Sequence, residues 1–338
     1  MDGSFKEVTE EAFRIGKVLK EYGKLLMETK VQTDDIGILY SLESDLINRI
    51  ENTVSGVNFW SFESTGYPYL YKKALVGVYT LFRELGIVPQ WVDTRQLKER
   101  MNSLKLLYLP ETFILMEDSA EEIKKFIENG GSVIAEEGVG LRSENTWLNT
   151  QCPGGRLGEI FGVKINERVA ADKEQGGRLN LFGRSIPAGG YLSYLQPRGS
   201  EIHGCWENGR TGATRKGNAI FIGTSLGASF HDNYQALYED YVHIMLSMLD
   251  SCGIHLAYNP SDRGLYIRKL TDGDKVILFA FNRSGEARKI ALSKDIKIIR
   301  EICTGGTDTT SEIPAYDVRV YLCNATRKEE KCITHAIE

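Results

Sequence analysis

The sequence predicts an α/β protein whose doubly wound, mostly parallel sheet is followed by a small all-β sandwich domain. Short apolar strands alternate with amphipathic helices over the first 135 residues, and glycines end several of these elements. After Ile254 the helices stop, and short strands follow one another with turn residues between them. The length of 338 residues is typical of two domains.

The elements of the first half are predicted from apolar periodicity. Apolar side chains recur about every 3.6 residues between residues 9 and 26, which indicates an amphipathic helix. Gly86 follows a second such helix as a C-cap, and Gly130 and Gly131 follow a third. The predicted elements are helix 9–26, strand 35–40, helix 69–85, strands 87–92 and 104–109, helix 119–128 and strand 132–135.

The second half begins with residues 154–212, which are rich in glycine and look irregular, with only short strand-like pieces. A buried strand at 218–223 and a strong helix at 234–252 follow. Beyond a boundary near 254–260, strands are expected at 265–270, 275–282, 288–292, 296–303 and 318–323. The chain therefore divides into an opening helix (1–30), an α/β domain (31–253), a β domain (254–325) and a polar tail (326–338).

Composition excludes several classes of function. The formal net charge is −5, and no basic run occurs, which argues against binding to nucleic acid or to an anionic membrane surface. No apolar run approaches the ~20 residues that a membrane-spanning helix needs. The six cysteines form no zinc-ligand spacing and are too sparse for a disulfide scaffold. Because the N-terminus lacks the features of a signal peptide, we expect a cytoplasmic protein.

The order of several motifs carries a resemblance to a known family. The motifs are DIGILYSLES at 35–44, LKLLYLP at 104–110, IKKFIENGGSVIA at 123–135, LGEIFGV at 157–163, RKGNAIFIGT at 215–224, LFAFN at 278–282 and IPAY at 313–316. This order resembles the part of glycoside hydrolase family 42 β-galactosidases (EC 3.2.1.23) that follows the catalytic barrel. The helix at 12–26 looks like the family's helix that leaves that barrel.

The resemblance implies a non-catalytic assembly portion. Residues 31–253 would be the family's trimerisation domain, with a fold similar to class I glutamine amidotransferases and flavodoxin. The implied partners are further copies of the chain in a homo-oligomer, a trimer, and a catalytic barrel encoded upstream. A galactoside substrate would bind only through that barrel, and no cofactor is implied.

No catalytic residue is carried over from the family. Its two catalytic glutamates lie on a (β/α)8 barrel, which takes ~250 residues alone and does not fit here. No HExxH, Walker A or EF-hand pattern occurs, so no metal site or cofactor is predicted.

Two atypical hydrolase sites remain as alternatives. Glu136 and Glu137 follow a predicted parallel strand, but adjacent residues of an extended segment point to opposite sides, which favours ordinary strand-end carboxylates. Ser225 lies in a G-x-S-x-G pattern after a strand, with His231 and His243 among the later histidines. The plain strand end is preferred for Ser225, because the oxyanion loop of an α/β-hydrolase is missing.

An aromatic segment is the remaining binding candidate. Trp60, Phe62, Tyr67 and Tyr69 lie close together in the sequence. Aromatic rings stack on sugars and also anchor protein interfaces. We prefer an interface or core role over direct sugar contact, and a carbohydrate-binding module is the alternative.

Overall fold

The computed structural model describes residues 4–54, 70–171, 177–254, 264–272, 275–290, 292, 296–304 and 311–325. The chain forms two compact units. One comprises Met1–Asp34, Arg83–Val88 and His255–Glu338, and the other comprises Asp35–Phe82 and Pro89–Ile254. We call them the β unit and the α/β unit. The aromatic candidates Trp60, Phe62, Tyr67 and Tyr69 lie outside the described residues.

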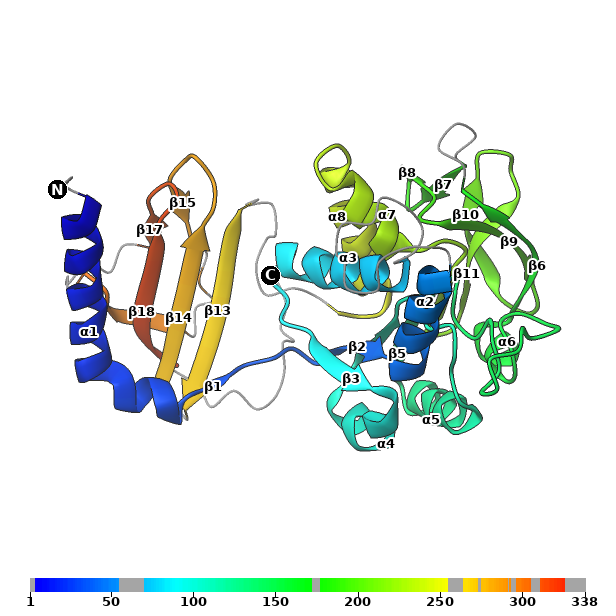
Figure 1. The fold of residues 1–338 in the computed structure, drawn as a ribbon, viewed down its shortest axis with the longest axis horizontal. Coiled ribbons are helices and arrows are strands. Elements are labelled where there is room, and N and C mark those ends of the chain that lie inside the picture. The colour runs from blue at the N-terminus through cyan, green and yellow to red at the C-terminus, as the bar shows by residue number, and fades with distance from the viewer. Residues whose placement is uncertain are drawn as a thin grey trace. The chain divides into compact units, whose positions relative to one another are not determined.

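The α/β unit is built on a nine-stranded sheet in the order β3-β2-β4-β5-β12-β11-β10-β7-β8 (Figure 1). Its parallel part contains β2 (Ile36–Tyr40), β3 (Gln90–Asp93), β4 (Leu106–Leu109), β5 (Ser132–Glu136) and β12 (Ala219–Ile222). Every residue of β4, β5 and β12 is buried, as expected for strands covered on both faces.

The remaining strands of this sheet correct the prediction of a mostly parallel sheet. They are β11 (Thr211–Lys216), β10 (Glu201–Trp206), β7 (Arg178–Leu181) and β8 (Arg184–Pro187), and each pairs antiparallel with its neighbour. The sheet is therefore mixed. A further antiparallel pair, β6 (Val163–Ala170) and β9 (Tyr191–Pro197), forms a two-stranded sheet of its own, here called the β6–β9 pair.

Residues 154–212, which look irregular in the sequence, thus contain most of these antiparallel strands. Some of their glycines occupy turns: Phe182 and Gly183 both have positive φ in the two-residue turn between β7 and β8. Register shifts in β6 and β10 break the strict alternation of apolar and polar residues. The period-2 signal is therefore weak even though the strands are well formed.

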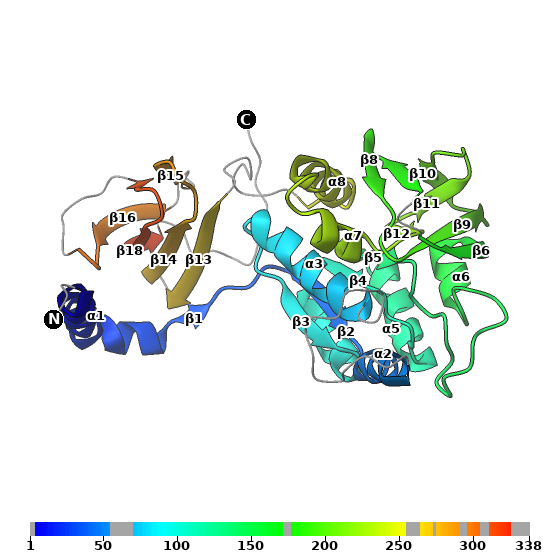
Figure 2. The ribbon, with the colours of Figure 1, turned by 45° about the horizontal axis from the view of Figure 1, so that its top comes forward.

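Helices cover both faces of the parallel part. Figures 1 and 2 show α3 (Leu70–Glu84), α7 (Leu226–Asn233) and α8 (Tyr238–Ser251) on one face, and Figure 1 shows α4 (Leu97–Arg100) and α5 (Glu117–Glu128) on the other. The α/β unit also contains the helices α2 (Leu42–Val54) and α6 (Leu157–Phe161). Short 3-10 helices lie at Thr94–Gln96 and Met101–Ser103. The helix α2 is absent from the sequence prediction.

Helices α3 and α7 touch through their backbones. A Cβ atom added to Gly77 would lie 1.8 Å from the carbonyl oxygen of Gly227, and one added to Gly227 would lie 2.3 Å from the carbonyl oxygen of Ala74. No side chain fits between the helices at this point, so both positions require glycine. The contact holds α7 close to the sheet, and with it the loop that precedes α7.

The β unit contains a five-stranded antiparallel sheet in the order β1-β13-β14-β18-β16. Its strands are β1 (Lys30–Val31), β13 (Leu265–Asp272), β14 (Lys275–Asn282), β18 (Val318–Ala325) and β16 (Ile296–Glu301). A second, two-stranded sheet pairs β15 (Arg288–Lys289) with β17 (Glu312–Ile313), and residues of both sheets share one apolar cluster.

The opening helix α1 (Ser4–Glu28) belongs to this unit. Val18, Tyr22, Leu25 and Leu26 pack against a cluster that includes Ile277 on one face of the sheet. Alternate residues of the same strands pack toward β15 and β17 on the other face. Residues 1–34 and residues 255–338 thus belong to one compact unit.

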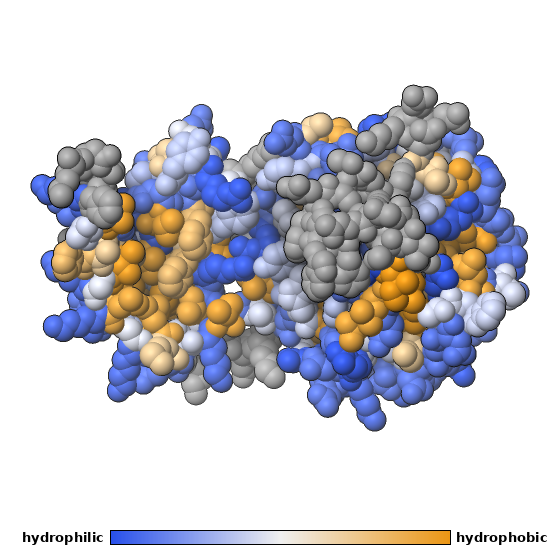
Figure 3. Space-filling model, in the orientation of Figure 1, coloured by the Kyte–Doolittle hydropathy of each residue, from blue (hydrophilic) through white to orange (hydrophobic). Residues whose placement is uncertain are grey.

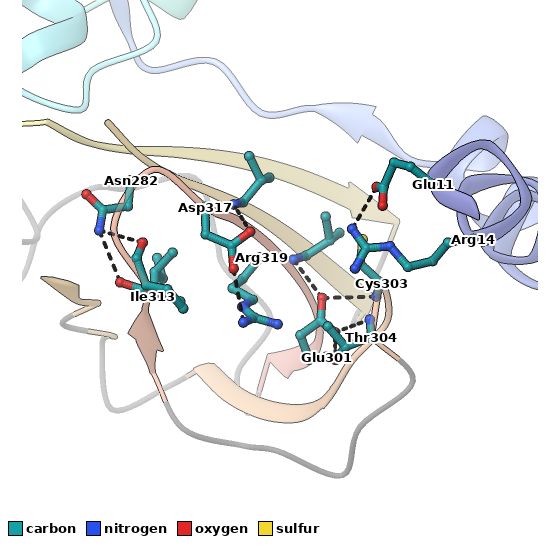
Figure 4. A network of polar contacts seen from close by, with 12 residues as sticks. Glu11, Arg14, Asn282, Glu301, Cys303, Thr304, Ile313, Asp317 and Arg319 are labelled. Atoms are coloured by element: carbon teal, nitrogen blue, oxygen red, sulfur yellow. Dashed lines mark hydrogen bonds and ion pairs between the residues drawn. The ribbon is translucent and has the colours of Figure 1, made fainter. Parts of the chain in front are cut away.

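Hydrogen bonds fix the turns of the β unit (Figure 4). The Glu301 carboxylate accepts hydrogen bonds from the backbone N–H groups of Cys303, Thr304 and Val320. Burial alone would raise the pKa of Glu301, but these bonds outweigh burial and lower it. The amide of Asn282 donates to the backbone carbonyls of Ile313 and Pro314, which ties β17 to β14.

Apolar side chains are also exposed on the β unit. Val8, Phe13, Ile15 and Leu19 of α1 are between 51% and 71% exposed. Figure 3 shows apolar residues gathered on the visible face of this unit, over β13 and β14. Within the described part of the chain, no helix is long and apolar enough to cross a membrane.

Candidate functional site

Three buried glutamates meet at the carboxyl ends of the central parallel strands. Glu111 follows β4 by two residues, Glu136 is the last residue of β5, and Glu137 comes next. All three are 0% exposed. The carboxyl edge of a parallel sheet is where α/β proteins usually place function, so we call these residues the carboxylate cluster and treat it as the candidate site.

Glu136 is held by three donors. Its Oε1 accepts hydrogen bonds from the Tyr108 hydroxyl at 2.9 Å and from the backbone N–H of Gly227 at 2.7 Å. Its Oε2 accepts a bond from the Ser225 hydroxyl at 2.8 Å. Burial raises the pKa of Glu136 to about 7, although these hydrogen bonds act in the opposite direction.

Glu137 faces the β6–β9 pair. Arg168 of β6 donates hydrogen bonds to both of its carboxylate oxygens, and the Ser193 hydroxyl of β9 donates to Oε1 at 3.2 Å. The guanidinium of Arg168 also lies 3.3 Å from the ring centroid of Tyr191, so it is stacked as well as paired. Glu137 therefore links the β6–β9 pair to the end of β5.

Glu111 has a different environment. Neither of its carboxyl oxygens receives a hydrogen bond from a described donor. Its backbone φ is 36°, a left-handed value that non-glycine residues rarely adopt. Burial, followed by the charges of Glu137 and Glu136, raises the pKa of Glu111 well above its ordinary value. Burial therefore disfavours the charged form of Glu111.

This arrangement does not suit glycoside hydrolysis. A retaining glycosidase needs two carboxylates ~5 Å apart that flank a sugar ring. Here the carboxylates are fully buried, and Glu136, the last residue of β5, binds different partners from Glu137, which lies in the turn that follows. Among the described residues, no group of three or more His, Cys, Asp and Glu could hold a metal ion.

Ser225 acts as a helix cap. It is the N-cap of α7, and its hydroxyl accepts a hydrogen bond from the N–H of Ala228 at 3.2 Å while it donates to Glu136. Of the later histidines in the described ranges, His231 contacts Asp232 and His243 contacts the carbonyl of Phe182. The G-x-S-x-G pattern therefore forms a capped helix start, and its serine is buried.

Sequence reasoning singled out Glu136, Glu137 and Ser225 but missed Glu111, Arg168, Ser193 and Tyr108. A signal for Glu111 existed, because it follows the predicted strand 104–109 as Glu136 follows the next strand, and both ends meet at one edge of the sheet. Arg168 had no comparable signal, since it lies on a strand that the sequence pattern does not reveal.

Comparisons with known proteins agree with this architecture. The β-galactosidase LacZ of Lactobacillus acidophilus is 22% identical over 329 residues, which cover 94% of this chain and 44% of that protein. The crystal structure of the β-galactosidase from Bacillus circulans sp. alkalophilus matches with a TM-score of 0.69 at 17% identity, over 92% of this chain and 44% of that chain. An alpha-L-fucosidase isoenzyme 2 from Paenibacillus thiaminolyticus has the same fold, with a TM-score of 0.60 at 11% identity, over 91% of this chain and 51% of that chain.

The chain thus spans less than half the length of the β-galactosidases it matches. The family model described as the beta-galactosidase trimerisation domain matches residues 34–245, which is more than half of the chain. This chain therefore belongs to the trimerisation domain family of glycoside hydrolase family 42 and corresponds to a C-terminal portion of a β-galactosidase of that family.

Proposed function

We propose that this chain holds copies of itself together as a trimer and takes no part in bond cleavage. The observation that carries the proposal is the match of residues 34–245, most of the α/β unit, to a trimerisation domain. Identical chains favour closed symmetric assemblies, and three copies give a ring with one repeated interface.

The trimerisation domain is proposed to have a flavodoxin-like, amidotransferase-like core. The parallel strands follow the spatial order β3-β2-β4-β5-β12. Numbered along the chain, this order is 2-1-3-4-5, which is the order of flavodoxin-like sheets. The region after β5 contains no cysteine between Glu136 and Gly140, so glutaminase chemistry does not accompany the fold.

Hydrolysis of galactosides is proposed to reside in polypeptide beyond this chain, in a catalytic barrel. The relatives named β-galactosidase are more than twice as long as the matched region. The exposed apolar side chains Val8, Phe13, Ile15 and Leu19 on α1 support a surface where such a partner packs. A cytoplasmic location is proposed as well, supported by free thiols at Cys152, Cys205, Cys252, Cys303 and Cys323.

The segment with Trp60, Phe62, Tyr67 and Tyr69 is proposed to contact a neighbouring copy. Its support is compositional, because aromatic residues are enriched at interfaces and Glu63 is the one charged residue between Trp60 and Tyr69.

A hydrolysis assay tests whether this chain takes part in bond cleavage. We expect the purified chain to release no nitrophenol from nitrophenyl β-galactoside or nitrophenyl acetate above the uncatalysed rate, because the cluster and Ser225 are buried. Hydrolysis that is retained through purification and lost in Ser225→Ala or Glu137→Gln would contradict the proposal.

A further inference from the structure

We propose that Glu111 and Glu137 share one proton as a carboxyl–carboxylate pair, and that this proton forms a pH-sensitive latch that keeps the β6–β9 pair fixed to the end of β5.

The first step is the count of buried charges. The charged and titratable groups facing Glu111 are Glu136 and Glu137 from the end of β5, Tyr108 from β4 and Arg168 from β6. The charges of Glu137 and Arg168 also act on the thiol of Cys152. Three ionised carboxylates against one guanidinium would leave uncompensated charge in a buried site, which costs far more than protonation of one group.

The second step identifies the group that carries the proton. Glu136 and Glu137 already accept hydrogen bonds from five donor groups, whereas neither oxygen of Glu111 receives one from the described residues. Once protonated, Glu111 becomes a donor, and the nearby carboxylate of Glu137 is its acceptor. A bond of this charge-assisted kind is among the stronger hydrogen bonds in proteins.

The third step is the preorganised geometry around Glu111. The left-handed φ of 36° is a conformation that the surrounding structure must impose on a glutamate. A Cβ on Gly138 would lie 2.1 Å from Glu111 Oε2, so the glycine that follows Glu137 leaves the space for this carboxyl. The carboxyl group of Glu111 therefore lies against the backbone of the residue that follows Glu137.

The fourth step connects the proton to the β6–β9 pair. Glu137 binds that pair on both strands, through Arg168 of β6 and Ser193 of β9. If Glu111 loses its proton, two facing carboxylates repel while they compete for one arginine. We therefore expect the attachment of the β6–β9 pair to weaken as the pH rises.

The direction of the pH effect follows from linkage. The pKa values of Glu111 and Glu136 are both raised in the folded protein relative to the unfolded chain. Groups of this kind contribute stability that is complete below the unfolded pKa and is lost as the pH rises through the folded pKa. The loss through Glu136 therefore ends once the pH has risen through about 7, and the loss through Glu111 has the same direction.

The test is thermal unfolding of the whole chain at pH values from 5 to 9. Wild type should lose melting temperature as the pH rises from 5 to 9. Glu111→Gln, whose amide donates to Glu137 without ionising, should lose less over the same range. Glu136→Gln should remove only the part that is lost as the pH rises to about 7, and the exposed Glu201→Gln should match wild type. A Glu111→Gln profile as steep as wild type would overturn the proposal.

A second measurement keeps the test decisive if Glu111→Gln does not fold. Infrared spectroscopy of Glu136→Gln in heavy water should show the C=O band of a protonated carboxyl group at neutral pH. The band should disappear as the pH is raised, and hydrogen exchange of the β6 and β9 amides, corrected for intrinsic rates, should accelerate over the same range. Absence of the band at neutral pH would contradict a shared proton.

Discussion

Arg168→Ala is expected to lower the free energy of unfolding by about 3–5 kcal/mol, because it leaves the buried Glu137 without its counter-charge. The Glu137 side chain is 0% exposed, and Arg168 is the cation that binds both of its oxygens. Removal of the guanidinium also ends its stacking on Tyr191. Urea denaturation followed by circular dichroism measures the change.

The chain offers a matched control for this substitution. Arg210 stacks on Tyr194 with the same 3.3 Å separation and pairs with Glu167 at 2.7 Å, but that pair is about half exposed. Arg210→Ala should therefore cost only about 1 kcal/mol. An equal loss of unfolding free energy in the two variants would show that burial of Glu137 does not strengthen its ion pair with Arg168. That result would contradict the structural role assigned to the carboxylate cluster.

Gly77→Ala is expected to destabilise the fold by about 3 kcal/mol or more, since overpacking against backbone cannot be relieved by a rotamer change. The new methyl group would lie 1.8 Å from the carbonyl oxygen of Gly227, so α3 and α7 must separate. The displacement would also disturb the N–H of Gly227, which donates to Glu136. The melting temperature and the urea midpoint report the loss.

Gly23→Ala is the control, because it makes the same glycine-to-alanine substitution in a helix where the added methyl group has room. Gly23 lies inside α1, and an added Cβ would meet nothing within 4 Å. Alanine is favoured over glycine in a helix interior by about 1 kcal/mol, so this variant should be slightly more stable than wild type. A Gly77→Ala variant as stable as Gly23→Ala would contradict the backbone contact between α3 and α7.

Much of the α/β arrangement was predictable because it depends on local patterns. The predicted strands near 35–40, 104–109, 132–135 and 218–223 correspond to β2, β4, β5 and β12. Their continuous apolar runs reflect burial on both faces. The helix predicted at 234–252 corresponds to α8, because its apolar residues recur at helical spacing.

The antiparallel half of the sheet was not predictable in the same way. Short strands such as β7 and β8 have four residues each, too few to establish a period. The helix α2 was missed although Leu42, Leu46, Ile50 and Val54 recur every four residues, a spacing typical of a helix. The short strands β7 and β8, by contrast, are specified by their neighbours in the sheet more than by their own sequence.

The candidate site was predictable only in part. Strand ends pointed to Glu136 and Glu137, and adjacency predicted that their side chains diverge. The contact of Glu137 with Arg168 joins residues 31 positions apart through a strand that the pattern does not show. The strained backbone of Glu111 has no sequence signature, since glutamate carries no preference for positive φ.

The assignment of this chain to assembly depends on association between copies, and sedimentation equilibrium measures that most directly. At tens of micromolar protein and neutral pH, we expect a mass three times the 38.0 kDa of the chain, stable to dilution through the micromolar range. A single species of 38.0 kDa at every concentration would contradict the account.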